Sequence, residues 1–364
     1  MRAWGLEGLK AWRPGGLKAW RPGGWKAAGA LVVVAAMSAT SQWATQTSGV
    51  TARLRGISAV SERVVWASGS NSTILRTIDG GATWKTIKAP VEDRLDFRDI
   101  DAIGADVAYL LSIGPGAASR IFKTTNAGAA WTQQYANTDP KVFFDAMTFW
   151  DARRGIVLSD SVDGQFYFLM TENGGTTWTR VPPASLPRAL DNEGFFAASG
   201  TNVTVRGNHI WVGTGAAAKA RVLHSRDRGR TWTVADTPLA SGASSGIYSI
   251  AFRDDRHGVI VGGDYAKEAA AVDNVAITSD GGAKWTLIKE RALSGFRSVV
   301  APVPHTRATW IAIGPQGSDI STDDGHTWTP VPGPGFDTFS FAPGKSIGWA
   351  SGARGTIAKL QMSN

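Results

Sequence analysis

The sequence of 364 residues contains no cysteine. This excludes disulfide bonds, thiolate metal ligands, a cysteine nucleophile and a lipid anchor on cysteine. Histidine is also scarce, and no two histidines lie three or four residues apart, so we expect no histidine-based metal site. The five histidines are His209, His224, His257, His305 and His326. The fold must therefore be held together by packing and hydrogen bonding, without covalent or metal cross-links.

Excess positive charge is nearly absent outside the first 26 residues. Of the formal net charge of +8, residues 1–26 supply +5, which leaves +3 for the rest of the chain. This remainder contains no dense run of lysine and arginine. We therefore expect no nucleic-acid partner.

Long hydrophobic runs are missing apart from residues 27–39, which are too few for the roughly 20 residues of a membrane span. This run follows the basic stretch, in which residues 8–15 are duplicated as 16–23, and it precedes small residues that are typical of a cleavage site. We predict that residues 1–44 are a signal peptide with a basic duplicated leader, cleaved between about residues 38 and 45. The protein would then be secreted or periplasmic, with no stable membrane span, although an uncleaved anchor is the alternative.

Glycine and tryptophan are abundant, and they recur in a Ser/Thr-x-Asp/Asn-x-Gly-x-x-Trp motif. The motif occurs six times, at 77–84, 124–131, 171–178, 225–232, 278–285 and 321–328. In such a turn the Asp or Asn side chain binds backbone amides, the glycine adopts a conformation that other residues avoid, and the tryptophan packs the turn down. We assign this structural role to Asp79, Trp84, Asn126, Trp131, Asn173, Trp178, Asp227, Trp232, Asp280, Trp285, Asp323 and Trp328.

The motif tryptophans are 47, 47, 54, 53 and 43 residues apart, a period typical of propeller blades. Four strands fit each repeat; in the fifth they are 247–252, 258–263, 274–278 and 285–288. Three more strands follow the sixth motif, at 336–341, 347–352 and 356–360, and residues 47–54 can supply the missing fourth. We therefore predict an all-β, seven-bladed β-propeller over residues 45–364, with four-stranded blades and the last blade closed by the N-terminal strand.

The six motifs have the residues of an Asp box, and the repeats resemble those of sialidases, sortilin-type propellers and photosystem II stability and assembly factors. The resemblance is closest to bacterial relatives of the assembly factors, through the strings Leu-Arg-Gly-Ile-Ser-Ala-Val at 54–60, Phe-Arg-Asp-Ile at 97–100 and Phe-Phe-Asp-Ala-Met at 143–147. It implies an exported, non-catalytic propeller that binds or scaffolds a protein partner. A photosystem partner is not itself implied.

An enzyme acting on a carbohydrate or another small polar substrate is the alternative, and catalysis stays open at this stage. The Arg-Ile-Pro or Arg-Leu-Pro signature of sialidases does not occur. Some sequences of this type are labelled oxidoreductases, and Gly-Thr-Gly-Ala-Ala-Ala at 213–218 formally matches a dinucleotide-binding fingerprint. Because this segment falls in a hairpin rather than before a helix, we expect no cofactor.

The axial mouth of the propeller, where loops from all blades converge, is the candidate binding site. Polar and charged residues that the repeat does not require fall there, namely Arg98, Asp99, Asp145, Tyr248, Arg297 and Asp337 near the starts of innermost strands, and Asp160, Asp264 and Tyr265 after second strands. The arginines can hold a carboxylate or phosphate, the aspartates can accept from hydroxyls or amines, and the tyrosines can supply apolar faces. The same charges could instead form buried ion pairs between blades.

Overall fold

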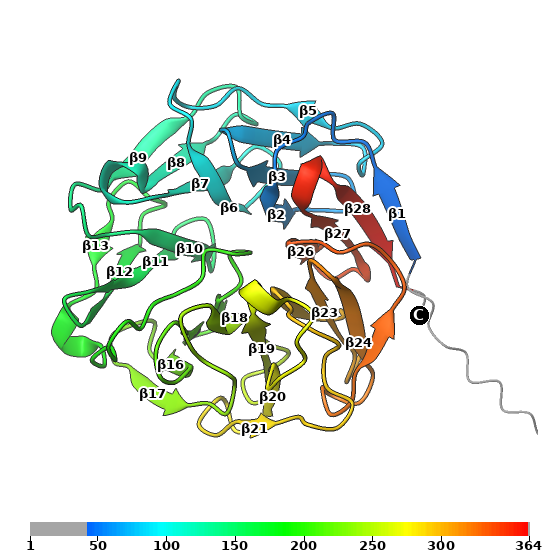
Figure 1. Cartoon of the computed structure of the whole chain (residues 1–364). Coiled ribbons are helices and arrows are strands. Elements are labelled where there is room, and N and C mark those ends of the chain that lie inside the picture. The colour runs from blue at the N-terminus through cyan, green and yellow to red at the C-terminus, as the bar shows by residue number, and fades with distance from the viewer. Residues whose placement is uncertain (1–41, 363–364) are drawn as a thin grey trace, which may run out of the picture. The chain divides into compact units, whose positions relative to one another are not determined.

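Seven four-stranded antiparallel sheets, arranged as blades around a central axis, form the described part of the chain, residues 42–362, in this computed structural model (Figure 1). The strands of blades 1 to 3 are β2 (Leu54–Ala59), β3 (Val65–Gly69), β4 (Thr73–Thr77), β5 (Lys85–Thr86), β6 (Asp96–Ala102), β7 (Ala108–Ile113), β8 (Arg120–Thr124), β9 (Thr132–Ala136), β10 (Phe144–Phe149), β11 (Gly155–Val162), β12 (Gln165–Thr171) and β13 (Thr179–Arg180). The predicted seven-bladed propeller is confirmed.

The remaining four blades follow in chain order around the ring (Figure 1). Their strands are β14 (Val203–Arg206), β15 (His209–Gly213), β16 (Arg221–Ser225), β17 (Thr233–Asp236), β18 (Ser245–Phe252), β19 (Gly258–Asp264), β20 (Val275–Thr278), β21 (Thr286–Leu287), β22 (Val299–Pro302), β23 (Trp310–Gly314), β24 (Gly317–Ser321), β25 (Thr329–Val331), β26 (Thr338–Phe341), β27 (Ile347–Ser351) and β28 (Ile357–Gln361). Helical structure in residues 42–362 is limited to four three-residue 3-10 turns, η1 (Gly116–Ala118), η2 (Pro183–Ser185), η3 (Tyr265–Lys267) and η4 (Ala353–Gly355). No helix in this range is long and apolar enough to cross a membrane.

The N-terminal strand β1 (Gln42–Gln46) closes blade 7 by pairing antiparallel with β28, from Gln42 opposite Gln361 to Gln46 opposite Ile357. The predicted closure is confirmed, but its predicted position at residues 47–54 was wrong. Residues 48–50 instead turn, with Gly49 at a φ of 76° and the Ser48 hydroxyl accepting from the Val50 amide, and Leu54 already begins β2. The predicted domain boundary after residue 44 therefore falls inside β1, and the predicted leader otherwise lies outside the described residues.

The six motif turns share one hydrogen-bond arrangement, seen in blade 1 between β4 and β5. The Thr77 hydroxyl accepts from the Gly81 amide (2.9 Å) and donates to Asp79 Oδ1 (2.7 Å), which also accepts from the Thr83 amide (2.9 Å). Gly81 has a φ of 88°, in the left-handed region that favours glycine. In blade 2, Ala130 lacks the threonine hydroxyl, but its backbone amide still donates to the side-chain Oδ1 of Asn126 (2.9 Å), so the variant motif forms the same turn.

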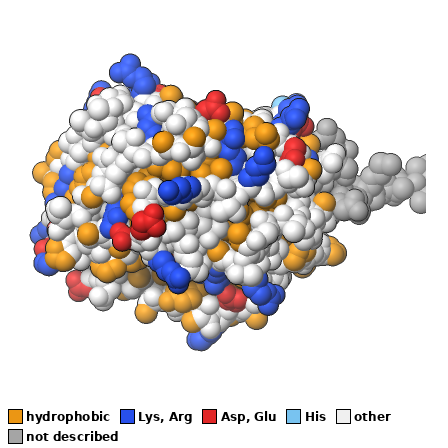
Figure 2. Space-filling model, turned by 90° about the horizontal axis from the view of Figure 1, so that it is seen from above, with side chains coloured by type: hydrophobic (Ala, Val, Ile, Leu, Met, Phe, Trp, Pro, Cys, Tyr) orange, Lys and Arg blue, Asp and Glu red, His pale blue; other side chains and the backbone are white. Residues whose placement is uncertain are grey.

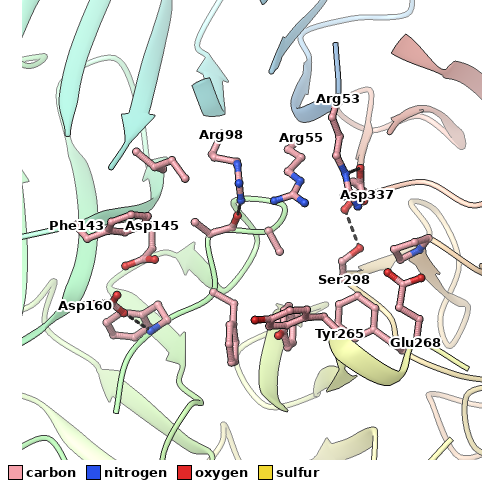
Figure 3. A pocket seen from close by; sticks show the side chains of 18 residues that line it. Arg53, Arg55, Arg98, Phe143, Asp145, Asp160, Tyr265, Glu268, Ser298 and Asp337 are labelled. Carbon is pink, nitrogen blue, oxygen red and sulfur yellow. Dashed lines mark hydrogen bonds and ion pairs between the residues drawn. The ribbon is translucent and has the colours of Figure 1, made fainter. Parts of the chain in front are cut away.

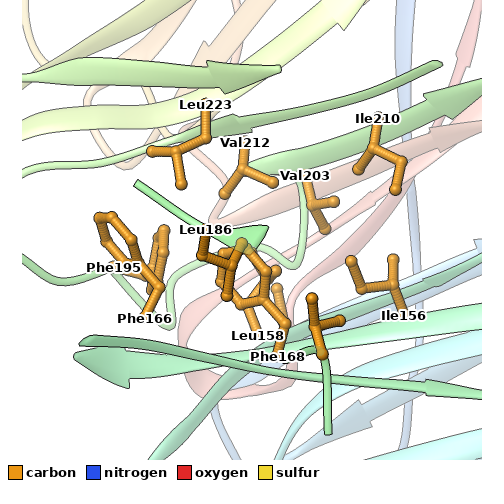
Figure 4. Close-up of a cluster of buried hydrophobic side chains, with 12 residues drawn as sticks. Ile156, Leu158, Phe166, Phe168, Leu186, Phe195, Val203, Ile210, Val212 and Leu223 are labelled. Carbon is orange, nitrogen blue, oxygen red and sulfur yellow. The ribbon is translucent and has the colours of Figure 1, made fainter. Parts of the chain in front are cut away.

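Hydrophobic clusters fill the spaces between neighbouring blades. Figure 4 shows the cluster between blades 3 and 4, where Ile156, Leu158 and Phe168 face Val203 and Ile210. Aromatic residues of second strands also bind the motif turn of the next blade. Trp211 donates to the Gly281 carbonyl (2.9 Å), and Tyr109 donates to that of Gly174 (2.9 Å). These contacts hold neighbouring blades together away from the axis, at the outer strands.

Candidate functional site

A cavity of about 400 Å³ lies where the inner strand ends of the blades converge (Figure 3). Its charged lining consists of three arginines and four acidic residues, and most of the remainder is aromatic. The charged residues are Arg53, Arg55, Arg98, Asp145, Asp160, Glu268 and Asp337, and the aromatic residues are Phe143, Phe195, Phe196, Tyr248, Tyr265 and Phe296. A concave site that combines aromatic surface with converging polar and charged groups is typical of a ligand-binding cavity.

A β-bulge at the same point of four innermost strands sets the direction of key side chains. The register between the first and second strands shifts on either side of Arg55 in β2, Arg98 in β6, Asp145 in β10 and Tyr248 in β18. A bulge inserts one unpaired residue and re-aims its side chain. All four bulge residues line the cavity.

The three arginines differ in their partners. Arg53 forms a two-point ion pair with Asp337, with both N–O distances 2.7 Å, which joins blades 1 and 7. Arg98 is paired with Asp96 (2.9 Å) and donates to the Ala197 carbonyl. Arg55 lies between them in Figure 3 and forms no hydrogen bond or ion pair with any residue of 42–362.

The environment of Arg55 disfavours its charged form. Burial, with smaller contributions from Arg98 and Arg53, lowers the pKa of Arg55 to about 10. The guanidinium is still charged at neutral pH, because this value lies well above 7. Arg55 is therefore a half-buried cation without an anionic partner among residues 42–362.

Two carboxylates from blade 3 occupy another part of the cavity wall. Asp145 is 1% exposed, and its Oδ2 has no hydrogen-bond partner among the described residues. Asp160 Oδ1 accepts from the Phe195 amide (2.8 Å). Burial raises the pKa of Asp145 well above its ordinary value, with a further contribution from Asp160, and burial also raises the pKa of Asp160.

The aromatic wall is a stacked group at the blade 5 side of the cavity. The rings of Phe196 and Tyr248 are parallel, with centroids 4.1 Å apart and an interplanar angle of 6°. Tyr265 meets both rings edge-on at 6.2 and 6.4 Å, and it is 52% exposed. Phe296 packs edge-on against Tyr248 at 4.6 Å. This group offers a preformed apolar surface next to the arginines.

Six of the nine site residues predicted from the sequence line the cavity. They are Arg98, Asp145, Asp160, Tyr248, Tyr265 and Asp337. Asp337 is engaged with Arg53, so this residue also forms one of the blade-bridging ion pairs that the sequence left open. The structure shows where these six residues lie, and their role in ligand binding stays a prediction.

The other three predicted residues, Asp99, Arg297 and Asp264, do not line this cavity. Asp99 is buried and accepts from the Met147 amide of the next blade (2.8 Å). Arg297 is buried against Asp319 within its own blade, with Nε and Nη2 each 2.7 Å from Oδ2. Asp264 caps η3 by accepting from the Ala266 amide (2.9 Å). All three side chains have structural hydrogen-bond or ion-pair partners, and none of them belongs to the wall of this cavity, where the sequence placed them.

Several cavity residues were missed in the sequence. Arg53 was overlooked because residues 47–54 were assigned to the closing strand. Arg55 lies just beyond that range and was not assigned to the site, although Leu-Arg-Gly at 54–56 parallels Phe-Arg-Asp at 97–99. That parallel is the signal that could have found Arg55. Phe195 and Phe196 lie in the long connection between β13 and β14, where no periodic pattern predicts a direction. Phe143, Glu268, Phe296 and Ser298 complete the polar and aromatic lining that was not predicted.

No cofactor or metal site emerges from the side chains of residues 42–362. No group of three or more His, Asp or Glu residues in this range could hold a metal ion. Residues 214–220 form the loop between β15 and β16, where the Thr214 hydroxyl donates to Glu193 (2.7 Å), and β16 rather than a helix follows it. The formal dinucleotide fingerprint is therefore part of a hairpin.

The fold and the cavity define a seven-bladed β-propeller with a site at its axis. No family model and no curated protein sequence matches the chain. Solved structures match its fold: "YCF48 bound to D1 peptide" has a TM-score of 0.62 and 16% identity over 90% of this chain and all of that one. YCF48 from Cyanidioschyzon merolae gives a TM-score of 0.63 and 18% identity, covering 89% of this chain and 99% of that chain.

A carbohydrate-active enzyme has a similar propeller. The GH74 xyloglucanase from Xanthomonas campestris has a TM-score of 0.61 and 15% identity over 88% of this chain, but this chain spans only 55% of that enzyme. Identities this low show the fold alone. At the level of the fold, the resemblance to assembly-factor propellers that the sequence predicted is confirmed.

Proposed function

We propose that this protein is a non-catalytic binding protein that holds a segment of a partner protein in its axial cavity, with an anionic group of that segment on Arg55. The observation that carries the proposal is the unpaired, half-buried guanidinium of Arg55 in a cavity of about 400 Å³. A buried charge without a partner costs free energy, which binding an anion offsets. A carboxylate fits best, because a guanidinium can bind it through two parallel hydrogen bonds.

The neighbouring groups support recognition of a peptide rather than of a free ion. Arg53 and Arg98 are held in place by their ion pairs with Asp337 and Asp96, which leaves Arg55 as the cavity arginine free to bind an anion. The stacked rings of Phe196 and Tyr248 provide an apolar surface for side chains of the segment. The similar fold of YCF48, solved with a D1 peptide, supports a peptide as the class of ligand.

The test is a binding screen of a peptide library with free C-terminal carboxylates, followed by affinity measurements on the strongest binders. Arg55→Gln should weaken binding at least about tenfold, which corresponds to about 1.4 kcal/mol. Arg153→Gln is the matched control, because Arg153 is exposed and lies in the turn between β10 and β11. Equal affinities for wild type and Arg55→Gln would refute the proposal.

Hydrolysis of a carbohydrate is the second candidate function, favoured by the two carboxylates with raised pKa values, Asp145 and Asp160, and by the xyloglucanase-like fold. A carboxyl that stays protonated near neutral pH can act as a general acid. Incubation with xyloglucan oligosaccharides tests it, and release of shorter sugars that Asp145→Asn abolishes would favour catalysis over binding alone.

A further inference from the structure

The carboxylates of Asp145 and Asp160 form a defined acidic pair in the cavity. Figure 3 shows them close together, on the far side of Arg98 from Arg55. Asp145 comes from the bulge of β10, and Asp160 comes from β11 of the same blade. Because both belong to one blade, their separation is set by strand pairing rather than by a flexible loop.

This pair lacks a neutralising partner. Neither carboxylate forms an ion pair with a basic residue of 42–362. Arg98, which is paired with Asp96, only partly offsets the effect of burial on the pKa of Asp145. Asp145 Oδ2 has no hydrogen-bond partner although the residue is 1% exposed, and Asp160 receives a single hydrogen bond, from Phe195. A buried carboxylate next to a half-buried one, both this poorly satisfied, destabilises a fold unless the two share a proton or bind a cation.

The chemistry of the surroundings selects the kind of cation. A metal ion would find only two protein carboxylates, because no third ligand is grouped with them in the described range. A primary ammonium is compact and has three donors, which match the free acceptor positions of two carboxylates. Phe143, which lies beside Asp145 in Figure 3 and also lines the cavity, can cover the methylene stem of such a group.

We propose that Asp145 and Asp160 form a subsite for a primary ammonium group, either a lysine side chain or a chain amino terminus. The inference rests on the proposed function, since it assumes that the cavity receives a protein segment. It adds that the segment carries a positive group as well as the anionic group that binds Arg55. The bound segment would therefore be held at two points of opposite charge, which fixes its direction in the cavity.

Binding of hexylammonium to the purified protein, measured by calorimetry, tests the subsite without a known partner. We expect saturable binding that Asp145→Asn and Asp160→Asn each weaken at least about tenfold. Arg55→Gln should not weaken it, because removal of a nearby positive charge favours a cation. Equal binding of hexanol, or equal affinity of the two aspartate variants and wild type, would overturn the subsite.

Two competitors distinguish the sources of the ammonium group. Nα-acetyl-lysine amide carries only a side-chain ammonium, and leucine amide carries only a terminal one. Displacement of hexylammonium by the first indicates a lysine side chain, and displacement by the second indicates an amino terminus. Displacement by neither would overturn the proposal.

Stability separates a binding role of Asp145 from a structural one. Asp145→Asn removes an unpaired buried charge and keeps the shape, so its melting temperature should equal or exceed that of wild type. If the variant does not fold, a crystal structure of wild type with hexylammonium decides: nitrogen between the two carboxylates supports the subsite, and binding elsewhere overturns it.

The subsite and the proposed function can fail separately. If binding of library peptides requires Arg55 but not Asp145 or Asp160, the peptide-binding function stands and the ammonium subsite is wrong. If binding of hexylammonium requires the two aspartates but no peptide binds, the subsite stands and the proposed function is wrong.

Discussion

Arg55 and Asp145 occupy the same bulge position in the innermost strands of blades 1 and 3, and neither forms an ion pair with any residue of 42–362. These two equivalent bulges thus place opposite charges at two points of the cavity wall. Figure 2 shows that on the ring's side, by contrast, basic and acidic side chains are scattered among neutral and hydrophobic ones. The proposed binding role rests on these two unpaired charges at the axis.

Packing between blades should account for much of the stability. The ring centroids of Trp232, in the blade 4 motif, and Phe168, in blade 3, are 5.4 Å apart, and Trp232 packs on the hydrophobic cluster between these two blades. Trp232→Ala should lower the free energy of unfolding by about 3 kcal/mol, through lost burial and a cavity. Denaturant unfolding measures this loss, and Val234→Ala, at a 39% exposed position, should change stability little. A loss below about 1 kcal/mol would contradict the structural role of the motif tryptophan.

Stability should fall as the pH rises from about 4 to about 8. Burial raises the pKa of Asp99 to about 8 and that of Asp101 to about 6, against roughly 3.9 in an unfolded chain. A carboxyl with a raised folded-state pKa contributes stability that is complete below the unfolded value and lost as pH rises through the folded value. Melting temperatures across this range measure the trend.

Asp99→Asn is the matched variant for this pH dependence, because its amide oxygen can still accept from the Met147 amide without titrating. The melting temperature of this variant should fall less steeply with pH than that of wild type. Identical slopes for the two proteins would show that Asp99 does not titrate in this window.

We propose that the protein is exported, and that cleavage occurs before Gln42. The basic and apolar order of residues 1–39 motivates export, and β1 must stay attached to pair with β28. Mass spectrometry of the exported protein should give an N-terminus between about residues 38 and 42. A mature cytoplasmic species that retains Trp12 and Trp20 would contradict this.

The architecture was predictable from the sequence because the same motif recurs in six blades. Six turns with the same Asp or Asn, Gly and Trp spacing account for six blades, and the three strands predicted after the sixth motif account for the seventh. The hydrogen bonds of each turn follow from local residues such as Thr77 and Asp79. The closing strand was misplaced because Gln42–Gln46 is short and polar and directly follows the apolar segment, so nothing local distinguishes it from a leader.

The site was only partly predictable because burial and pairing are tertiary properties. Arg297 and Arg55 both lie near the start of an innermost strand, yet only the buried partner Asp319, 22 residues away, makes Arg297 structural. A bulge likewise leaves no mark in a strand's alternation, so the direction of Arg55 could not be inferred from periodicity. Phe196 reaches the cavity from a connection without regular structure.

The most direct measurement of the central claim is the affinity of one C-terminal library peptide for wild type, Arg55→Gln and Arg153→Gln, with its amidated form alongside. We predict that Arg55→Gln and amidation each weaken binding at least about tenfold, that the two losses are not additive, and that Arg153→Gln binds like wild type. Full affinity of Arg55→Gln for the same peptide would contradict recognition of an anionic group at the axis.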